Sequence, residues 1–205
     1  LVTALVAPFA AIAGVGVATA AGVFDSLPDY ISLGQLSQRN TIYGIKKGEY
    51  VPIAYTWDQN RIEVSLDEIS DYAKWAAIAG EDPSFYQHNG VDIKGASRGL
   101  IGVLIGKDLG GGSTIDMQTV RNWLKLKAEA EGNDEGINAA LEVSFERKLK
   151  EMKLALQLNK QYTKDEILNS YLNMAHFGGV VYGIEAAAKT YYSKSASDLT
   201  IAEAA

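Results

Sequence analysis

The chain has 205 residues, a net charge of −6 and no cysteine, and hydrophobic residues make up 47% of it. This length suits one domain with a sizeable core and a short additional segment. The acidic balance argues against general affinity for nucleic acid. The lack of cysteine excludes disulfides, thiol catalysis and cysteine metal sites, and two histidines argue against a histidine-rich metal site.

Residues 1–24 carry no charge. A helix with a rise of about 1.5 Å per residue would cross a hydrocarbon core of about 30 Å over this length. We expect a transmembrane anchor here, and a signal peptide is the alternative because small residues precede Ala21. Asp25 and Asp29 follow, with no Lys or Arg before Arg39, which favours an extracytoplasmic location for the rest.

Residues 25–60 are predicted to be a leader with short strands, because β-branched and aromatic residues there are interrupted by Gly and Pro. From about residue 65 onward the pattern is almost entirely helical, which predicts a mainly α domain over 61–205. Ser65 and Glu68 form a capping box that is expected to open a helix. This helix should end near Glu81, because the residue before Pro83 disfavours the helical conformation.

The later helices are marked by caps and glycines. Three glycines lead into Ser113, which with Asp116 gives a capping pattern for the next helix. The stretch "EGNDEG" predicts a loop before a long helix at 139–159, and Thr163 begins another helix with Glu166 as its capping partner. Residues 182–205 are expected to form two short helices.

Glu81 and Asp82 are adjacent acids that allow two interpretations. They either cap and solvate a turn, or they include a catalytic carboxylate. For Glu81, the negative end of its helix, the neighbouring Asp82 and nearby aromatic residues all favour proton uptake, as a general base requires. His88 in the same loop either holds the loop or donates to an anion.

The helix expected at 139–159 presents charges in an unusual place. Counting about 100° per residue from Leu141 gives one apolar stripe and one polar arc. The stripe is Leu141, Phe145, Leu149, Met152 and Leu156. Arg147, Lys148 and Glu151 fall outside the polar arc, among apolar positions, where an unpaired charge is costly. They form either a structural ion pair, Arg147 with Glu151, or a charged patch that lines a cleft.

The glycines before Ser113 and Thr114 open a helix, and free backbone N–H groups at such an end suit an anion. No Lys-Ser or Lys-Thr follows, so this is not a nucleotide P-loop. Gln118 and Arg121 lie about one turn further on and would extend a phosphate contact.

Taken in order, these motifs resemble the glycosyltransferase domain of class A penicillin-binding proteins, glycosyltransferase family 51. The first signature of that family is complete here as Glu81, Asp82, Phe85, His88, Gly90 and Asp92. The second is matched by "GGSTIDMQTVRN", and the third by Arg147, Lys148 and Glu151. Two further blocks extend the resemblance over about 61–205.

The resemblance implies a lysozyme-like helical domain that polymerises lipid II on the outer face of the cytoplasmic membrane. Glu81 then matches the general base for the acceptor hydroxyl. Glu151 matches the second carboxylate, near the pyrophosphate or a Mg²⁺ or Mn²⁺ ion. The implied substrate-binding residues are Asp82, Phe85, His88, Ser113, Thr114, Gln118, Arg121, Arg147 and Lys148. Membrane lipid, the growing glycan strand and cell-wall synthesis proteins are the implied partners.

The chain departs from the family pattern in the second signature. Asp116 and Met117 replace the usual Thr-Gln, and Arg121 replaces the usual Lys. An extra carboxylate near the phosphate site is expected to alter metal use or weaken donor binding. The connection to Arg147 is longer and more acidic than usual, and the domain is expected to continue beyond Ala205. A lysozyme-like hydrolase and a membrane-anchored scaffold with a decayed site are the alternative functions.

Overall fold

The computed structural model describes residues 33, 36, 38, 40–56, 59–93, 95, 112–142 and 144–205. The predicted anchor at 1–24 lies outside this part of the chain, as do Gly110 and Gly111. Within the described residues, no helix is both long enough and apolar enough to cross a membrane. The prediction of a mainly α domain is confirmed.

The elements follow one another as β1 (Asn40–Lys46), β2 (Glu49–Thr56), β3 (Asn60–Arg61), η1 (Leu66–Glu68), α2 (Asp71–Glu81), η2 (Phe85–Gln87), α4 (Ile115–Ala130), α5 (Asp134–Leu141), α6 (Phe145–Gln161), α7 (Lys164–Met174), β4 (Val181–Tyr182), α8 (Ile184–Tyr192), η3 (Ala196–Asp198) and α9 (Ile201–Ala204).

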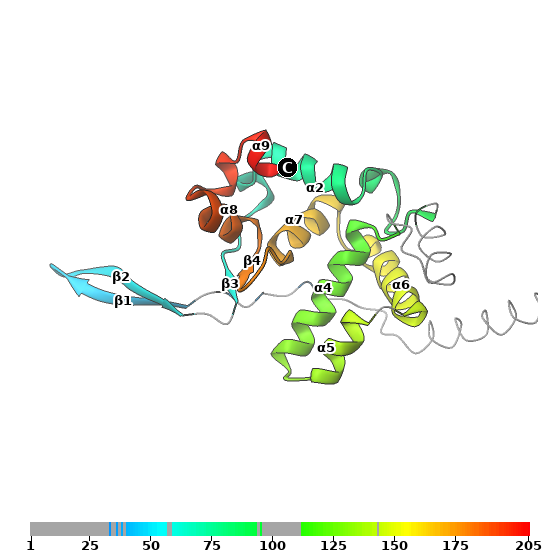
Figure 1. Ribbon diagram of the computed structural model, residues 1–205, viewed down its shortest axis with the longest axis horizontal. Coiled ribbons are helices and arrows are strands. Elements are labelled where there is room, and N and C mark those ends of the chain that lie inside the picture. Colours follow the sequence, from blue (N-terminus) through cyan, green and yellow to red (C-terminus); the bar gives the residue numbers. More distant parts are fainter. Residues whose placement is uncertain are drawn as a thin grey trace, which may run out of the picture.

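The predicted strands of the leader are confirmed as an antiparallel hairpin of β1 and β2. Lys47 and Gly48 both have positive φ, 54° and 85°, which suits the two-residue turn that connects twisted strands. Figure 1 shows this hairpin standing away from the helical body. β3 belongs to the body instead, because it pairs in parallel with β4, so it straddles the predicted boundary between residues 60 and 61.

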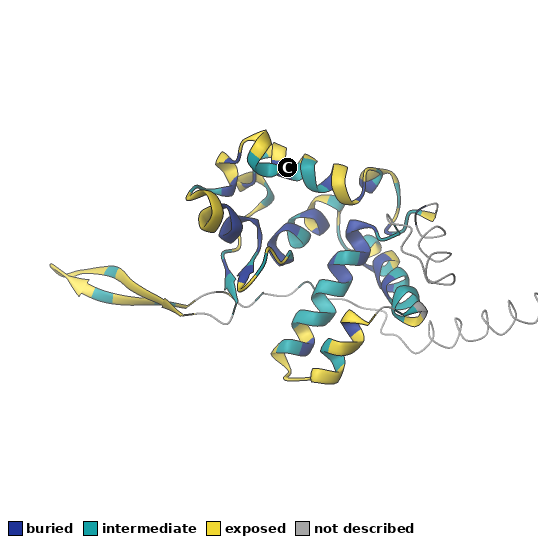
Figure 2. Ribbon diagram, viewed as in Figure 1, coloured by how far each residue is buried: buried dark blue, intermediate teal, exposed yellow. Residues whose placement is uncertain are grey.

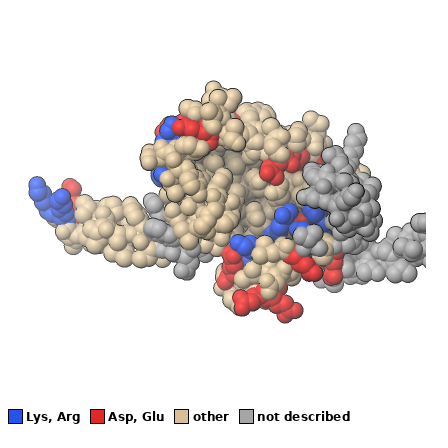
Figure 3. Space-filling view, viewed as in Figure 1, with Lys and Arg blue, Asp and Glu red and all other residues tan. Residues whose placement is uncertain are grey.

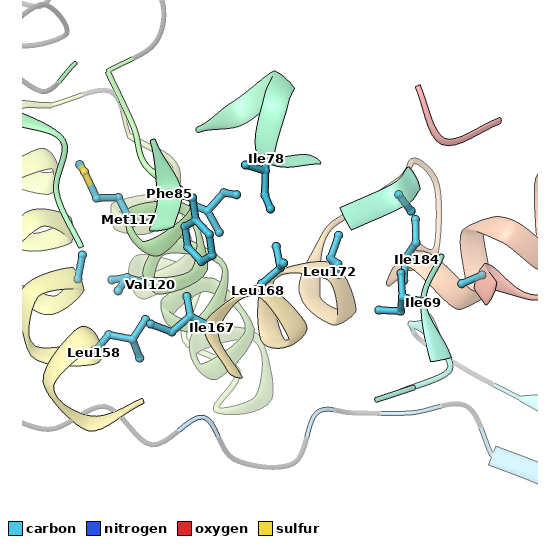
Figure 4. Close-up of a cluster of buried hydrophobic side chains, with 14 of the residues drawn as sticks. Ile69, Ile78, Phe85, Met117, Val120, Leu158, Ile167, Leu168, Leu172 and Ile184 are labelled. Atoms are coloured by element: carbon cyan, nitrogen blue, oxygen red, sulfur yellow. The ribbon is translucent and has the colours of Figure 1, made fainter. Parts of the chain in front are cut away.

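The core lies where α4, α6 and α7 meet the end of α2 (Figure 4). Phe85, Ile167 and Leu168 are fully buried near its centre, with Ile78 above them. Figure 2 shows the same contrast along the chain: α4 and α7 are largely buried or half-buried, whereas the hairpin is mostly exposed. Burial of these apolar side chains is the main stabilising contribution to this part of the fold.

Two predicted helix starts are wrong by a few residues. The capping box of Ser65 and Glu68 is present, but it closes only the short η1, and α2 begins later with Ser70 as its N-cap. α4 is capped by Thr114 rather than Ser113, because the Thr114 side chain accepts from the backbone N–H of Met117. The hydroxyl of Ser113 is therefore left for other partners.

The long helix predicted at 139–159 is two helices. α5 begins within the stretch that was predicted to be a loop and takes in its second half, 134–136, and it folds back beside α4. Asn133 caps α5, and the Ser144 side chain caps α6 by accepting from the N–H of Arg147. These two caps favour separate helices over one continuous helix.

The apolar stripe predicted on this helix is also wrong. Leu141 and Leu156 are 54% and 40% exposed, so they do not form a buried stripe. The buried face of α6 contains Leu154, Ala155 and Leu158. Apolar residues occupy two sides of α6, and packing against α4 and α7 buries the side of Leu154 and Leu158 instead of the predicted stripe.

Candidate active site

Glu81 is the last residue of α2, as predicted, and its side chain is exposed. It lines a cleft of about 390 Å³ together with Ser84, Gln87, Asp92 and Ser113. The Nε2 of Gln118, on α4, donates to Oε2 of Glu81 at 2.7 Å. Helix α4 therefore holds one oxygen of this carboxylate at the edge of the cleft.

The loop that follows Glu81 is held by hydrogen bonds to the start of α4. Oδ2 of Asp82 accepts from the His88 ring at 2.8 Å and from the N–H of Ile115 at 3.1 Å. The Thr114 hydroxyl donates to the carbonyl of Gly90 at 2.7 Å. These bonds join the loop to the first turn of α4, the helix that carries Gln118.

Gly90 and His88 complete this attachment. Gly90 has a φ of 100°, and a Cβ at this position would lie 2.5 Å from the carbonyl oxygen of Ala155. Only glycine tolerates both the conformation and the close approach of α6. The Gly90 N–H donates to Nδ1 of His88 at 3.1 Å, so Nε2 is the nitrogen that carries the proton toward Asp82.

A second carboxylate, Glu151 on α6, is buried among three cations. Its Oε1 accepts from Nε of Arg121 at 2.9 Å and from a guanidinium N–H of Arg147. The Lys148 ammonium lies 3.5 Å from Oε2. The predicted pairing of Arg147 with Glu151 is confirmed, but it is one contact of a larger cluster. We call these four residues the Glu151 cluster.

The Glu151 cluster carries an excess of two positive charges and faces the cleft through Ser113. The Ser113 hydroxyl accepts from the Lys148 ammonium and, at 3.4 Å, from Arg121. Figure 3 shows Lys and Arg gathered over the middle of the molecule, with acidic side chains along the lower rim. Burial lowers the pKa of Lys148, as do Arg121 and Arg147, while Glu151 opposes them. Such a cluster is suited to an anion.

The same sequence region is shared with known proteins. Residues 49–205 match the family model described as transglycosylase. Penicillin-binding protein 1A of Clostridium perfringens strain 13 is 38% identical over 182 residues, which cover 86% of this chain and 24% of that protein. This chain belongs to the transglycosylase family.

Two other relatives differ in size. Penicillin-binding protein 1F of Bacillus subtilis strain 168 is 38% identical over 161 residues, 78% of this chain and 20% of that protein. A monofunctional glycosyltransferase of Staphylococcus haemolyticus is 40% identical over 149 residues, 69% of this chain and 50% of that protein. The chain thus spans half or less of the length of these relatives.

The predicted site residues differ in what they contact and in how far they are buried. Those at the cleft or in the Glu151 cluster are Glu81, Ser113, Gln118, Arg121, Arg147, Lys148 and Glu151. Asp82 and Thr114 also line the cleft, although each is only 4% exposed, and Phe85 is fully buried. Asp82, Thr114 and His88 fix the loop through hydrogen bonds as well. What any of these residues does toward a substrate stays a prediction.

The surroundings of Glu81 are less apolar than expected. Trp75 and Tyr86 are 62% and 50% exposed, and only Phe85 is buried. One residue that the sequence did not single out is Tyr171 on α7. Burial, with the charge of Glu81 in second place, raises its pKa to about 12. At neutral pH it is therefore a neutral hydroxyl in the field of Glu81.

Asp116, the extra carboxylate of the second signature, is fully buried and is bound by Lys164 and Asn159. Its partners lie far along the chain, and no local motif connects them. It is not among the residues that line the cleft at Glu81. Its effect on metal use or donor binding stays a prediction.

A divalent cation was expected at Glu151. The Glu151 oxygen left for a metal is Oε2, which is buried and accepts no hydrogen bond from the residues that the structure describes, and three protein cations surround the carboxylate. One carboxylate oxygen in such surroundings fits Mg²⁺ only if a ligand supplies phosphate oxygens as well.

Proposed function

We propose that this chain is the glycosyl-transferring domain of a peptidoglycan polymerase. It joins lipid II units into β-1,4-linked glycan with inversion at the anomeric carbon and releases undecaprenyl pyrophosphate. The observation that carries the proposal is that α4 contacts both carboxylates: Gln118 binds Glu81, and Arg121 binds Glu151. A proton acceptor and a cationic anion site are thereby held on one rigid element.

Glu81 acts as the general base. Gln118 occupies its Oε2, and within the described residues no hydrogen bond is made to Oε1. This free oxygen accepts the proton of the acceptor 4-hydroxyl as that oxygen attacks the anomeric carbon of the donor. A base is needed because a sugar hydroxyl is a poor nucleophile at neutral pH.

The Glu151 cluster stabilises the leaving group. Pyrophosphate needs no protonation to depart, so fixed positive charge is the more effective contribution. Arg121, Arg147 and Lys148 supply this charge, and Glu151 orients the two guanidinium groups. Glu151 would hold a Mg²⁺ or Mn²⁺ ion, which would supply further positive charge against the leaving group.

The same cluster argues against the alternative functions. A lysozyme-like hydrolase has no pyrophosphate to bind, so a buried cluster with excess positive charge would not serve it. A scaffold with a decayed site has no need for the bond between Gln118 and Glu81.

We further propose a lysozyme-like arrangement of the helices, an anchor at 1–24, a location on the outer face of the cytoplasmic membrane, and cell-wall synthesis proteins as partners.

The test is incubation of the detergent-solubilised protein with labelled lipid II and, separately, with purified glycan. Chain growth by the wild type that is abolished in Glu81→Gln supports the proposal. Shortened glycan without growth would instead indicate the hydrolase, and lipid II binding without turnover would indicate the scaffold.

A further inference from the structure

Asp116 joins three helices at one buried carboxylate. It lies in the first turn of α4, and its side chain is completely buried. Both of its oxygens accept from the Lys164 ammonium at 3.1 Å, and Oδ1 also accepts from the Asn159 amide. Lys164 is the first residue of α7, and Asn159 belongs to α6. The carboxylate therefore connects α4 to both neighbouring helices.

The same ion pair touches the loop that follows Glu81. Nδ1 of His88 lies 3.9 Å from Oδ2 of Asp116, and Nε2 of His88 binds Asp82. The Lys164 ammonium lies 4.4 Å from the centre of the Phe85 ring, an arrangement that attracts a cation to an aromatic face. The loop thus rests on the pair at two points.

A buried ion pair contributes little net stability at this position. Desolvation of both charges offsets much of their attraction, and apolar side chains of similar volume often stabilise a fold as well or better. Burial raises the pKa of Asp116, and Lys164, Asn159 and His88 partly oppose that shift. A role in geometry would explain the pair where stability alone does not.

We propose that the ion pair of Asp116 and Lys164 is a positioning device that sets the place of Glu81 relative to Gln118. The inference rests on the proposed function, in which Glu81 is the base. Neither residue of the pair lines the cleft, so both act through the loop and are positioning residues rather than catalytic ones.

A metal site in the same place is the competing interpretation, because ligand atoms of Asp82, His88 and Asp116 lie within 4.8 Å of one another. The hydrogen bonds already present argue against it. The Lys164 ammonium already donates to the carboxylate oxygens of Asp116, and Nδ1 of His88 accepts from the N–H of Gly90. A cation would have to displace both partners.

The first experiment compares Lys164→Met with Lys194→Met. Lys194 pairs with Glu203 away from the cleft, so its variant is the matched control and is expected to keep wild-type turnover. In Lys164→Met, kcat per folded molecule is expected to fall at least about tenfold with little change in KM, because a displaced base slows the reaction without removing substrate contacts.

The second experiment uses pH. Loss of the ammonium removes a group that lowers the pKa of Asp116, so the unpaired carboxylate takes up a proton more readily. The kcat of Lys164→Met relative to wild type is therefore expected to rise as pH falls. Asp82 and His88 also face Asp116, so Asp116→Asn/Lys164→Met serves as the control: it keeps both and should lose this recovery.

The apolar double variant Asp116→Leu/Lys164→Met decides between positioning and packing. This variant is expected to fold, and its kcat is expected to stay as far below the wild-type value as that of Lys164→Met. Wild-type kcat in this folded variant would overturn the proposal. Amide hydrogen exchange gives a readout that needs no activity: the N–H groups of Gly90 and Ile115 should lose protection in the double variant, and unchanged protection would also contradict the proposal. Lack of lipid II polymerisation by the wild type would instead contradict the proposed function.

Discussion

Glu81 and Glu151 are carboxylates of the same site in opposite surroundings. Glu81 is exposed at a helix end, and among the described residues its side chain has one hydrogen bond, from Gln118. Glu151 is fully buried and contacts three cations. An exposed acid can exchange protons with a ligand, whereas a buried acid that compensates cations fixes their positions. The contrast indicates that the first is suited to chemistry and the second to electrostatics.

Glu81→Gln is expected to have the largest effect on turnover. Loss of a general base lowers the rate by about 10³-fold, while the unfolding free energy should hardly change because the side chain is exposed. Rates of lipid II polymerisation and a thermal melt measure the two quantities. Glu135→Gln, an exposed acid in the first turn of α5, is the control. If Glu81→Gln were active, the contrast between the two carboxylates would be broken.

Lys148→Met is expected to lower kcat about 100-fold, since one preorganised charge at the leaving group is lost. Its stability should be near wild type, because removing a desolvated ammonium offsets the lost contact with Glu151. Steady-state kinetics and urea unfolding measure both effects. A variant that loses stability and keeps its kcat would show that the cations serve the fold alone.

Glu151→Gln is expected to lower the unfolding free energy by about 3 kcal/mol, because it leaves like charges together without their buried counter-ion. Urea unfolding at neutral pH measures this loss. Inorganic pyrophosphate should restore part of it by binding the exposed excess charge of the native state. An unchanged unfolding free energy would mean that the negative charge of Glu151 is not needed to compensate the three cations.

Glu185→Gln tests a buried carboxylate outside the site and should have the smallest effect. Burial acts to raise the pKa of Glu185, but hydrogen bonds from Ala196, Lys189 and Ser195 lower it below its ordinary value. Its ionised form therefore stabilises the fold above pH 4.5, and that contribution disappears as pH falls through the lowered pKa.

The variant should lose about 1 kcal/mol at pH 7 and show a weaker dependence of unfolding on acid pH, with kcat per folded molecule unchanged. Thermal melts from pH 7 to acid pH measure the first two. A lowered kcat would place Glu185 in the active site and blur the comparison of Glu81 with Glu151.

Local patterns located most of the site. Pro83 marked the end of α2 correctly, and the four-residue spacing of Arg147 and Glu151 predicted their pair. The partners that come from distant segments were not accessible in this way. Asp116 meets Lys164, 48 residues away, and that contact depends on how α4 and α7 pack.

The errors have the same origin. The break before α6 depends on the Ser144 cap, which competes with a helical pattern that continues across it. Phe85 and Thr114 belong to the signature motifs, but their burial depends on tertiary packing and not on their spacing. Motifs therefore identified which residues gather near the site, and only the fold shows which of them are buried.

Gln118 and Arg121 are three residues apart on α4, and each holds one carboxylate. The rise of about 1.5 Å and the turn of about 100° per residue therefore fix the distance and the angle between the two side chains. Inserting a single residue between them would rotate one of the two side chains by about 100° around the helix, away from its carboxylate, although no residue of the site would be lost. The number of residues between these two positions is therefore as important to the site as the identity of the side chains.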